Sequence, residues 1–262
     1  MKNPDFMIKN PELPKKVDRL SAFFQVFDLS VRVSDRVSSD ADASLVVLGD
    51  SEQSAQRLVL CTGSPARPST KGNVLVRASV GFGGPLNPLI AALPKQVAAD
   101  LKNLPALHAV ANAFVDEALH ARCGQSAVID RLCEVMLLMI LRRVVDAGAA
   151  TPGLLAGLSH PALHRALVAM HDAPDRAWRV ESLASVSGMS RSQFMASFRQ
   201  TVGTTPSAYL TAWRLMLARR ALANGEKIKA IAHRVGFGSA SAFSRAYLRA
   251  FGCSPIAARQ TS

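Results

Sequence analysis

Two short stretches near the C-terminus carry side chains that could hydrogen-bond to the edges of nucleic-acid bases. Each stretch has two aromatic residues four positions apart, which predicts a helix with one buried face. The exposed faces would then present Arg191, Ser192, Gln193, Met195, Ala196 and Arg199 on the first helix, and Ala240, Ser241, Ser244, Arg245 and Arg249 on the second. Arg and Gln can form paired hydrogen bonds with guanine and adenine, and small residues allow close approach to a thymine methyl group. We interpret the faces as base-reading surfaces; the alternative is that they are ordinary solvated helix faces.

The same region contains an internal repeat. VESLASVSGM, which starts at Val180, matches IKAIAHRVGF, which starts at Ile228, at an offset of 48 residues. The offset then becomes 49, and the matched residues are Phe194, Phe198, Gly203 and Pro206 with Phe243, Tyr247, Gly252 and Pro255. The extra residue falls in a turn, where insertions are tolerated. Such a repeat indicates two copies of one structural unit.

Each copy has the anatomy of a helix-turn-helix unit. We expect the first helix of each unit over Val180–Ser187 and Lys227–Val235. These helices end at Gly188 and Gly236, because glycine adopts the left-handed backbone of a helix end without strain. The N-caps expected for the second helices are Ser190 and Ser239.

A linker helix is predicted between the two units. Pro206 suits a first helical turn, and Gly225 suits a helix stop. A helix over residues 207–223 would be about 25 Å long. A straight spacer of that size could hold the two second helices about 34 Å apart, which is one turn of B-DNA; a kinked spacer is the alternative.

The positive charge of the chain is concentrated in the same region. The formal net charge is +12, yet residues 160–262 hold 14 Lys and Arg against 4 Asp and Glu. The preceding residues are nearly balanced, with 17 basic and 15 acidic side chains. A basic domain beside a neutral one is typical of a protein that binds a polyanion. Charge alone leaves open whether the partner is DNA, RNA or another acidic molecule.

The C-terminal strings resemble the AraC/XylS family of transcription regulators. The strings are LASVSGMSRSQFMASFRQTVGTTPSAYLTAWRLMLARRAL and IAHRVGFGSASAFSRAYLRAFGCSP, which follow the family pattern through both units and the linker. The resemblance implies a DNA-binding domain over 159–262, with units at 180–202 and 227–251. It also implies that Arg245 contacts a base or a phosphate. Many members have a basic residue where Ala196 stands, so we expect the first unit to read DNA through its other exposed side chains.

The N-terminal part is expected to be an α+β domain over 17–150. Residues 1–16 predict a flexible tail, residues 17–29 a short helix, and residues 31–82 short strands separated by turn residues. Helices should follow within 86–147, over Leu86–Leu93, Val97–Leu101, Leu107–Ala121 and Ala127–Ala147. This part resembles a shortened cupin-type sensor domain, which implies an effector-binding or dimerisation role, with the last helix as a candidate dimer contact. The fold class is therefore mostly α with a small β unit, followed by an all-α double helix-turn-helix domain.

Other chemistries find little support. No nucleotide-binding, nucleophile-elbow or paired-carboxylate motif occurs, so we expect neither an enzyme nor a cofactor. The histidines His160, His164 and His171 are interpreted as surface or capping residues rather than metal ligands. Redox sensing by Cys61, Cys123 or Cys133 is the less favoured alternative to structural cysteines. The N-terminus lacks the apolar segment of a secretory signal, and a cytoplasmic location is expected.

The sequence thus predicts a transcription regulator that binds promoter DNA through two recognition helices. Further partners expected from this role are RNA polymerase, a small-molecule effector and a second copy bound through the N-terminal helices. The alternative is a protein that binds RNA or an acidic partner and has no role in transcription.

Overall fold

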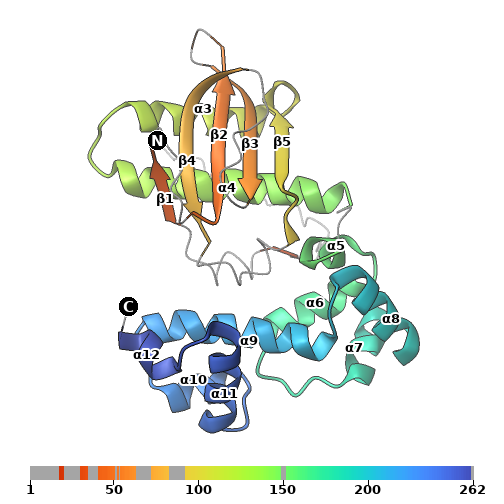
Figure 1. Cartoon of the computed structure of the whole chain (residues 1–262). Helices are drawn as coiled ribbons and strands as arrows, with labels where there is room; N and C mark the ends of the chain where they lie inside the picture. The colour runs from red at the N-terminus through yellow and green to blue at the C-terminus, as the bar shows by residue number, and fades with distance from the viewer. Residues whose placement is uncertain are drawn as a thin grey trace, which may run out of the picture.

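The computed structural model describes residues 18–20, 30–34, 41–50, 52, 54–62, 72–82, 92–148 and 152–260. They form a sheet domain, which comprises β1 to β5 with α3 and α4, and a helical domain, which comprises α6 to α12 (Figure 1). Helix α5 (Leu154–Ser159) lies between the two domains. The predicted fold class is confirmed: a small β unit comes first, and an all-α part follows.

The sheet domain is built on one antiparallel sheet with strand order β1-β4-β2-β3-β5. The strands are β1 (Ser30–Val33), β2 (Ala43–Gly49), β3 (Ala55–Thr62), β4 (Asn73–Gly81) and β5 (Gln96–Asp100). The first four confirm the strands predicted within 31–82. The central strand β2 is buried on both faces, which explains its nearly continuous apolar run.

Strand β5 corrects one prediction. The sequence predicts a helix over Val97–Leu101, but residues 96–100 form a strand that pairs with Arg57–Cys61 of β3. Alanine is a strong helix former, but the propensity of so short a segment is small, and the open edge of β3 offers residues 96–100 a ladder of backbone hydrogen bonds that outweighs it. A short 3-10 helix, Leu101–Asn103, follows, and Asp100 caps it.

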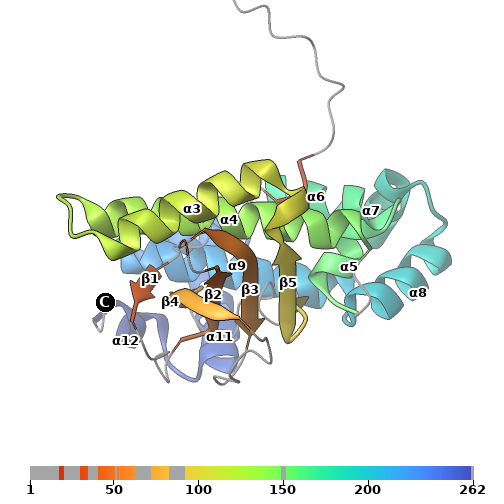
Figure 2. The same cartoon turned by 90° about the horizontal axis from the view of Figure 1, so that it is seen from above.

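A helical hairpin covers one face of the sheet. It comprises α3 (Pro105–Leu119), which packs on β3 and β4, and α4 (Gln125–Asp146), which contacts β1 (Figure 2). The helices predicted over Leu107–Ala121 and Ala127–Ala147 are confirmed within two residues. The helix predicted over Leu86–Leu93 lies mostly outside the described residues, as does that over 17–29; the tail over 1–16 lies wholly outside them.

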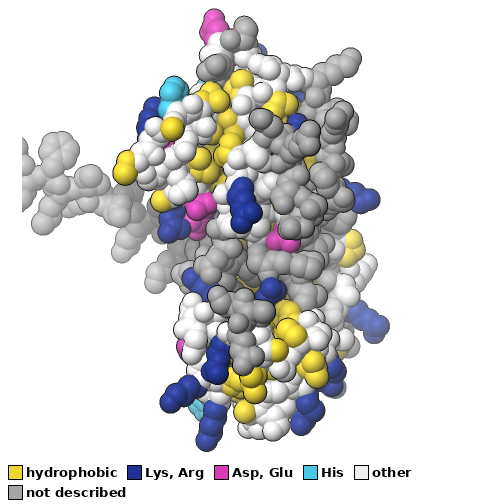
Figure 3. Space-filling view, turned by 60° about the vertical axis from the view of Figure 1, so that its left-hand side comes forward, with side chains coloured by type: hydrophobic (Ala, Val, Ile, Leu, Met, Phe, Trp, Pro, Cys, Tyr) yellow, Lys and Arg dark blue, Asp and Glu magenta, His cyan; other side chains and the backbone are white. Residues whose placement is uncertain are grey.

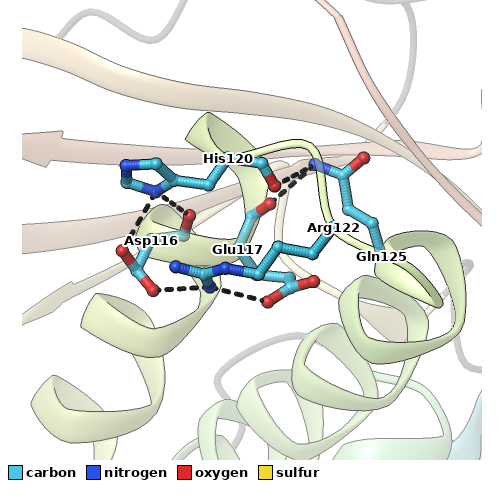
Figure 4. Close-up of polar contacts among 5 residues, drawn as sticks. All are labelled: Asp116, Glu117, His120, Arg122 and Gln125. Atoms are coloured by element: carbon cyan, nitrogen blue, oxygen red, sulfur yellow. Dashed lines mark hydrogen bonds and ion pairs between the residues drawn. The ribbon is translucent and has the colours of Figure 1, made fainter.

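A polar network fixes the turn of this hairpin (Figure 4). The Arg122 guanidinium donates to Asp116 at 2.8 Å and to Glu117 at 3.1 Å. Gln125 donates to the backbone carbonyls of Glu117 and His120. The hydrogen bond from Arg122 holds the pKa of the Asp116 carboxyl below its usual value. These contacts tie the end of α3 to the start of α4.

One apolar core continues from the sheet domain into the helical domain. It includes Leu137 of α4, Leu155 of α5 and Phe198 of the helical domain. At the same junction, Arg19 donates a hydrogen bond to the backbone carbonyl of Leu158 at 3.0 Å. The two domains are therefore packed together through α5 rather than joined by a solvated tether.

The helical domain comprises α6 (Leu163–Asp172), α7 (Val180–Ser187), α8 (Arg191–Val202), α9 (Pro206–Ala223), α10 (Ile228–Arg234), α11 (Ala240–Phe251) and α12 (Pro255–Gln260). Helix α9 runs between the pair α7–α8 at one end and the group α10–α12 at the other (Figure 1). Among the described helices, none is long and apolar enough to cross a membrane.

Candidate nucleic-acid interface

The first helix-turn-helix unit is α7 followed by α8. Helix α7 ends at Gly188, whose φ of 67° is the left-handed conformation that the sequence predicts. Ser190 then caps α8 in a capping box: its hydroxyl accepts from the Gln193 N–H, and the Gln193 side chain accepts from the Ser190 N–H. Such a cap contributes about 1 kcal/mol and fixes where the second helix starts.

The second unit repeats this design with a simpler cap. Helix α10 is one residue shorter at each end than the predicted Lys227–Val235, and the chain turns at Gly236, whose φ is 82°. A Cβ at Gly236 would lie 2.7 Å from the Asp175 Cα, so glycine also allows close packing against the loop before α7. Ser239 caps α11 by accepting from the Ala242 N–H.

Aromatic pairs anchor both second helices, as the sequence predicts. Phe194, Phe198 and Phe243 are fully buried, and Tyr247 is 1% exposed. The rings of Phe194 and Phe198 lie 5.6 Å apart, as do those of Phe243 and Tyr247. Each buried ring contributes roughly 1.5–3 kcal/mol through the apolar area removed from water. The opposite faces of α8 and α11 are left to solvent.

Helix α9 is the predicted linker, and it is one uninterrupted helix. Its 18 residues correspond to about 27 Å. Trp213 belongs to the core shared with the first unit, whereas Leu215 and Leu222 belong to a separate core under the second unit. Arg214, in the middle of α9, donates hydrogen bonds to the backbone carbonyls of Pro174 and Arg176, in the loop between α6 and α7. The linker is thus a packed helix in contact with both units.

The predicted base-reading residues all lie on α8 and α11, but their environments differ. Met195, Ala240 and Ser244 are partly buried, and the others are exposed. Arg191 forms an ion pair with Glu181 of α7, with 3.0 Å between Nε and Oε1. The Gln193 carbonyl oxygen is engaged by the cap. No ion pair involves Arg199, Arg245 or Arg249 within the described ranges, so these three guanidinium groups face solvent.

Sequence reasoning missed several charged groups beside these helices. Lys227 and Lys229 are exposed at the start of α10, the first helix of the second unit. Dark-blue Lys and Arg side chains stand around the helical domain in the lower half of Figure 3, where carboxylates are rare. The repeat itself could have identified Lys229, because the 48-residue offset makes it equivalent to Glu181 and so reveals a change of charge between the units.

The histidines differ in part from the prediction. His160 is a capping residue, because its Nδ1 accepts from the N–H groups of Ala162 and Leu163. His171, in contrast, is buried: its Nε2 lies 2.7 Å from the Tyr209 hydroxyl, and its ring lies 4.3 Å from that of Trp213. Burial lowers the pKa of His171 to about 3. The prediction of a surface residue was wrong for His171, because α9 covers this face of α6. It was also wrong for His164, which is buried within α6.

The cysteines divide by exposure. Cys133 is fully buried in α4, and burial raises the pKa of its thiol to about 12. Burial also raises the pKa of Cys61 on β3. Cys123 is exposed beside the α3–α4 turn. In the described part of the chain, no three His, Cys, Asp or Glu side chains gather where they could hold a metal ion.

Two helix-turn-helix units on a shared linker helix, joined to a sheet domain, define a DNA-binding regulator with two domains. Comparison with known proteins agrees. A family model described as a helix-turn-helix domain matches residues 183–261, and a cupin model matches residues 30–146.

An AraC-like transcription regulator of Streptomyces antibioticus is 36% identical over 219 residues, covering 75% of this chain and 72% of that protein. The activator RclR of Escherichia coli is 36% identical over 140 residues, covering 53% of this chain and 49% of that protein. The solved DNA-binding domain of AdpA, in complex with a target DNA, is 29% identical and covers 39% of this chain and 93% of that domain, with a TM-score of 0.37. The chain belongs to the AraC family of transcription regulators, and it is a DNA-binding transcription regulator.

Proposed function

We propose that α8 and α11 enter successive major grooves on one side of a promoter duplex. The observation that carries this proposal is that a single 18-residue helix packs against both units, while the two second helices keep solvent-exposed faces rich in arginine. A helix of this kind fits the wide major groove of B-DNA, and a stiff spacer lets both units dock together.

Within this proposal, Arg245 reads a base edge or holds a phosphate from the second unit, and Arg249 and Arg199 add further contacts. The small side chains of Ala196 and Ala240 let the backbone of each helix approach the bases. The arginines and lysines of both units supply a large part of the affinity through the phosphates, which makes binding strongly dependent on salt.

A competition experiment tests this function. Full-length protein bound to a duplex that it enriches from a random-sequence pool is challenged with the same sequence as duplex RNA. We expect the RNA to compete at least tenfold more weakly, because the major groove of A-form RNA is too narrow for a recognition helix. Equal competition by RNA would overturn the proposal. Footprinting should also show two protected segments one helical turn apart.

The sheet domain is proposed to bind a second copy through α4. Val128, Leu132, Val135 and Met139 follow the alternating spacing of four and three residues that two packed helices use. Val128 is 41% exposed and Val135 is 42% exposed, although the opposite face of α4 is buried in the core. The partly buried Leu132 and Met139 complete the stripe. This α4 stripe is continuous along three helical turns, and a second copy would cover it.

The remaining roles are proposed from the family and the fold. The sheet domain receives a small-molecule effector and passes its effect through α5 to the first unit, which the continuous core supports. The bound regulator then contacts RNA polymerase at the promoter. Because such a protein acts on genomic DNA, we place it in the cytoplasm, and we assign no catalytic reaction to it.

A further inference from the structure

The two DNA-reading units differ strongly in charge. Residues 227–251 of the second unit hold five cationic side chains, namely Lys227, Lys229, Arg234, Arg245 and Arg249. One of them, Arg234, forms an ion pair of 2.7 Å with Glu226, which directly precedes this range. The equivalent residues 179–202 of the first unit hold three arginines, Arg179, Arg191 and Arg199, together with one carboxylate, Glu181. Units with the same fold therefore present different electrostatic surfaces to the duplex.

The difference is focused at one position of the repeat. Glu181 in the first turn of α7 and Lys229 in the first turn of α10 are equivalent residues, so the charge is inverted between the units. In the second recognition helix, the residue equivalent to Arg191 is Ala240. The carboxylate and its arginine thus occur as a pair in the first unit and are both replaced in the second.

Glu181 and Arg191 contact each other across the turn. Their side chains are 62% and 72% exposed, and 3.0 Å separates the Glu181 Oε1 from the Arg191 Nε. An ion pair this exposed is weak, because water screens it. It can therefore open when a better acceptor arrives. A guanine offers two acceptors at once, O6 and N7, whereas a mismatched base offers a poorer set.

We propose that Glu181 is a specificity-determining residue, which keeps Arg191 from binding phosphates indiscriminately and releases it only to a matching base. The second unit, which has more cations and no counterpart of Glu181, supplies the larger share of the electrostatic anchoring. The inference rests on the proposed function, and it gives the units unequal shares of the two tasks: the second holds the duplex more strongly, and the first tests its sequence more strictly.

The test compares Glu181→Gln with Lys229→Gln, two exposed substitutions that each remove one charge. Binding to the duplex enriched from a random pool, and to poly(dI-dC), is measured over a salt series with full-length protein. For Glu181→Gln we expect poly(dI-dC) affinity to rise about three- to tenfold with a smaller gain on the enriched duplex. The ratio of the two affinities then falls, and the plot of log affinity against log salt concentration becomes steeper by about one unit of slope. For Lys229→Gln we expect both affinities to fall together and the slope to become shallower by about one.

The double variant Glu181→Gln/Arg191→Ala separates this role from general repulsion. If Glu181 acts through Arg191, the double variant and the single variant Arg191→Ala should discriminate equally between the two duplexes. An unchanged discrimination ratio in Glu181→Gln would overturn the inference, and so would an equal change in both affinities. If wild-type protein binds neither duplex, both the proposed function and this inference fail. If wild-type protein binds both, the comparison tests only the role of Glu181.

Discussion

The backbone N–H of Gly153 donates a hydrogen bond of 2.8 Å to the carbonyl oxygen of Thr201, in the last turn of α8. Gly153 also sits against the sheet domain, since a Cβ at this position would lie 3.0 Å from the Cβ of Ala92. One residue at the start of α5 therefore touches both the sheet domain and the end of the first recognition helix.

Substituting Gly153→Ala should destabilise the protein by about 2–4 kcal/mol. The backbone at Gly153, with φ of 154° and ψ of −170°, lies in a region that only glycine adopts readily, and the new methyl group would press on Ala92. Gly148→Ala is the matched control, because φ there is 77° and nothing lies within 4 Å of the new Cβ. It should cost only about 1–2 kcal/mol of backbone strain. Urea unfolding measures both; an equal loss in the two variants would show that the contact with Ala92 contributes nothing.

Arg245→Ala should weaken binding to the enriched duplex by about 1–3 kcal/mol without changing the fold. The side chain is exposed on α11 and has no ion-pair partner within the described ranges, so its removal leaves the core untouched. A fluorescence-anisotropy titration gives the affinity, and circular dichroism checks the helix content. Arg57→Ala, an exposed arginine on β3, is the control and should bind like wild type. Wild-type affinity in Arg245→Ala would contradict the role proposed for Arg245.

If two copies associate through the α4 stripe, as proposed, Val135→Glu should convert the dimer to a monomer. The substitution places a charge in the middle of the α4 stripe, and a second copy could cover it only at a cost of several kcal/mol. Sedimentation at micromolar concentration reports the mass. Ala113→Glu, at an exposed position of α3 outside the stripe, should leave the dimer intact. A wild-type protein that is already monomeric would rule out the proposed contact.

Stability should fall as the pH is lowered from about 6.5. In the unfolded chain His171 takes up a proton near pH 6.5, but in the folded chain it stays neutral down to about pH 3. Since the unfolded state then binds more protons, the free energy of unfolding drops by up to ~1.4 kcal/mol per pH unit. His171→Gln should flatten this dependence, although His164, whose pKa burial also lowers, will retain part of it. The exposed His120→Gln serves as the control, and an unchanged slope in His171→Gln would refute the assignment.

Local patterns predicted most of the helical domain. The residues that end and cap a helix act over a few positions, so Gly188, Ser190 and Ser239 could be assigned from the sequence. The aromatic anchors followed from their spacing of four. The base-reading roles assigned to the exposed residues stay predictions.

The contacts that depend on tertiary packing were not predictable. Residues 96–100 form a strand because the edge of β3 is available for pairing, and the local sequence QVAAD does not indicate that edge. The burial of His171 depends on how α9 crosses α6. The pairing of Glu181 with Arg191 depends on the angle between two helices, and residue types alone do not fix that angle.

Because its two units are not identical, the DNA-binding domain is asymmetric along its length. Because the first and second units carry different side chains at equivalent positions, a single chain distinguishes the two ends of its binding site, and it cannot land equally well when turned around. Reversing the site within a promoter would therefore carry the sheet domain from the upstream side to the downstream side. The orientation of the site, and not only its sequence, would then decide whether the regulator faces the start of transcription.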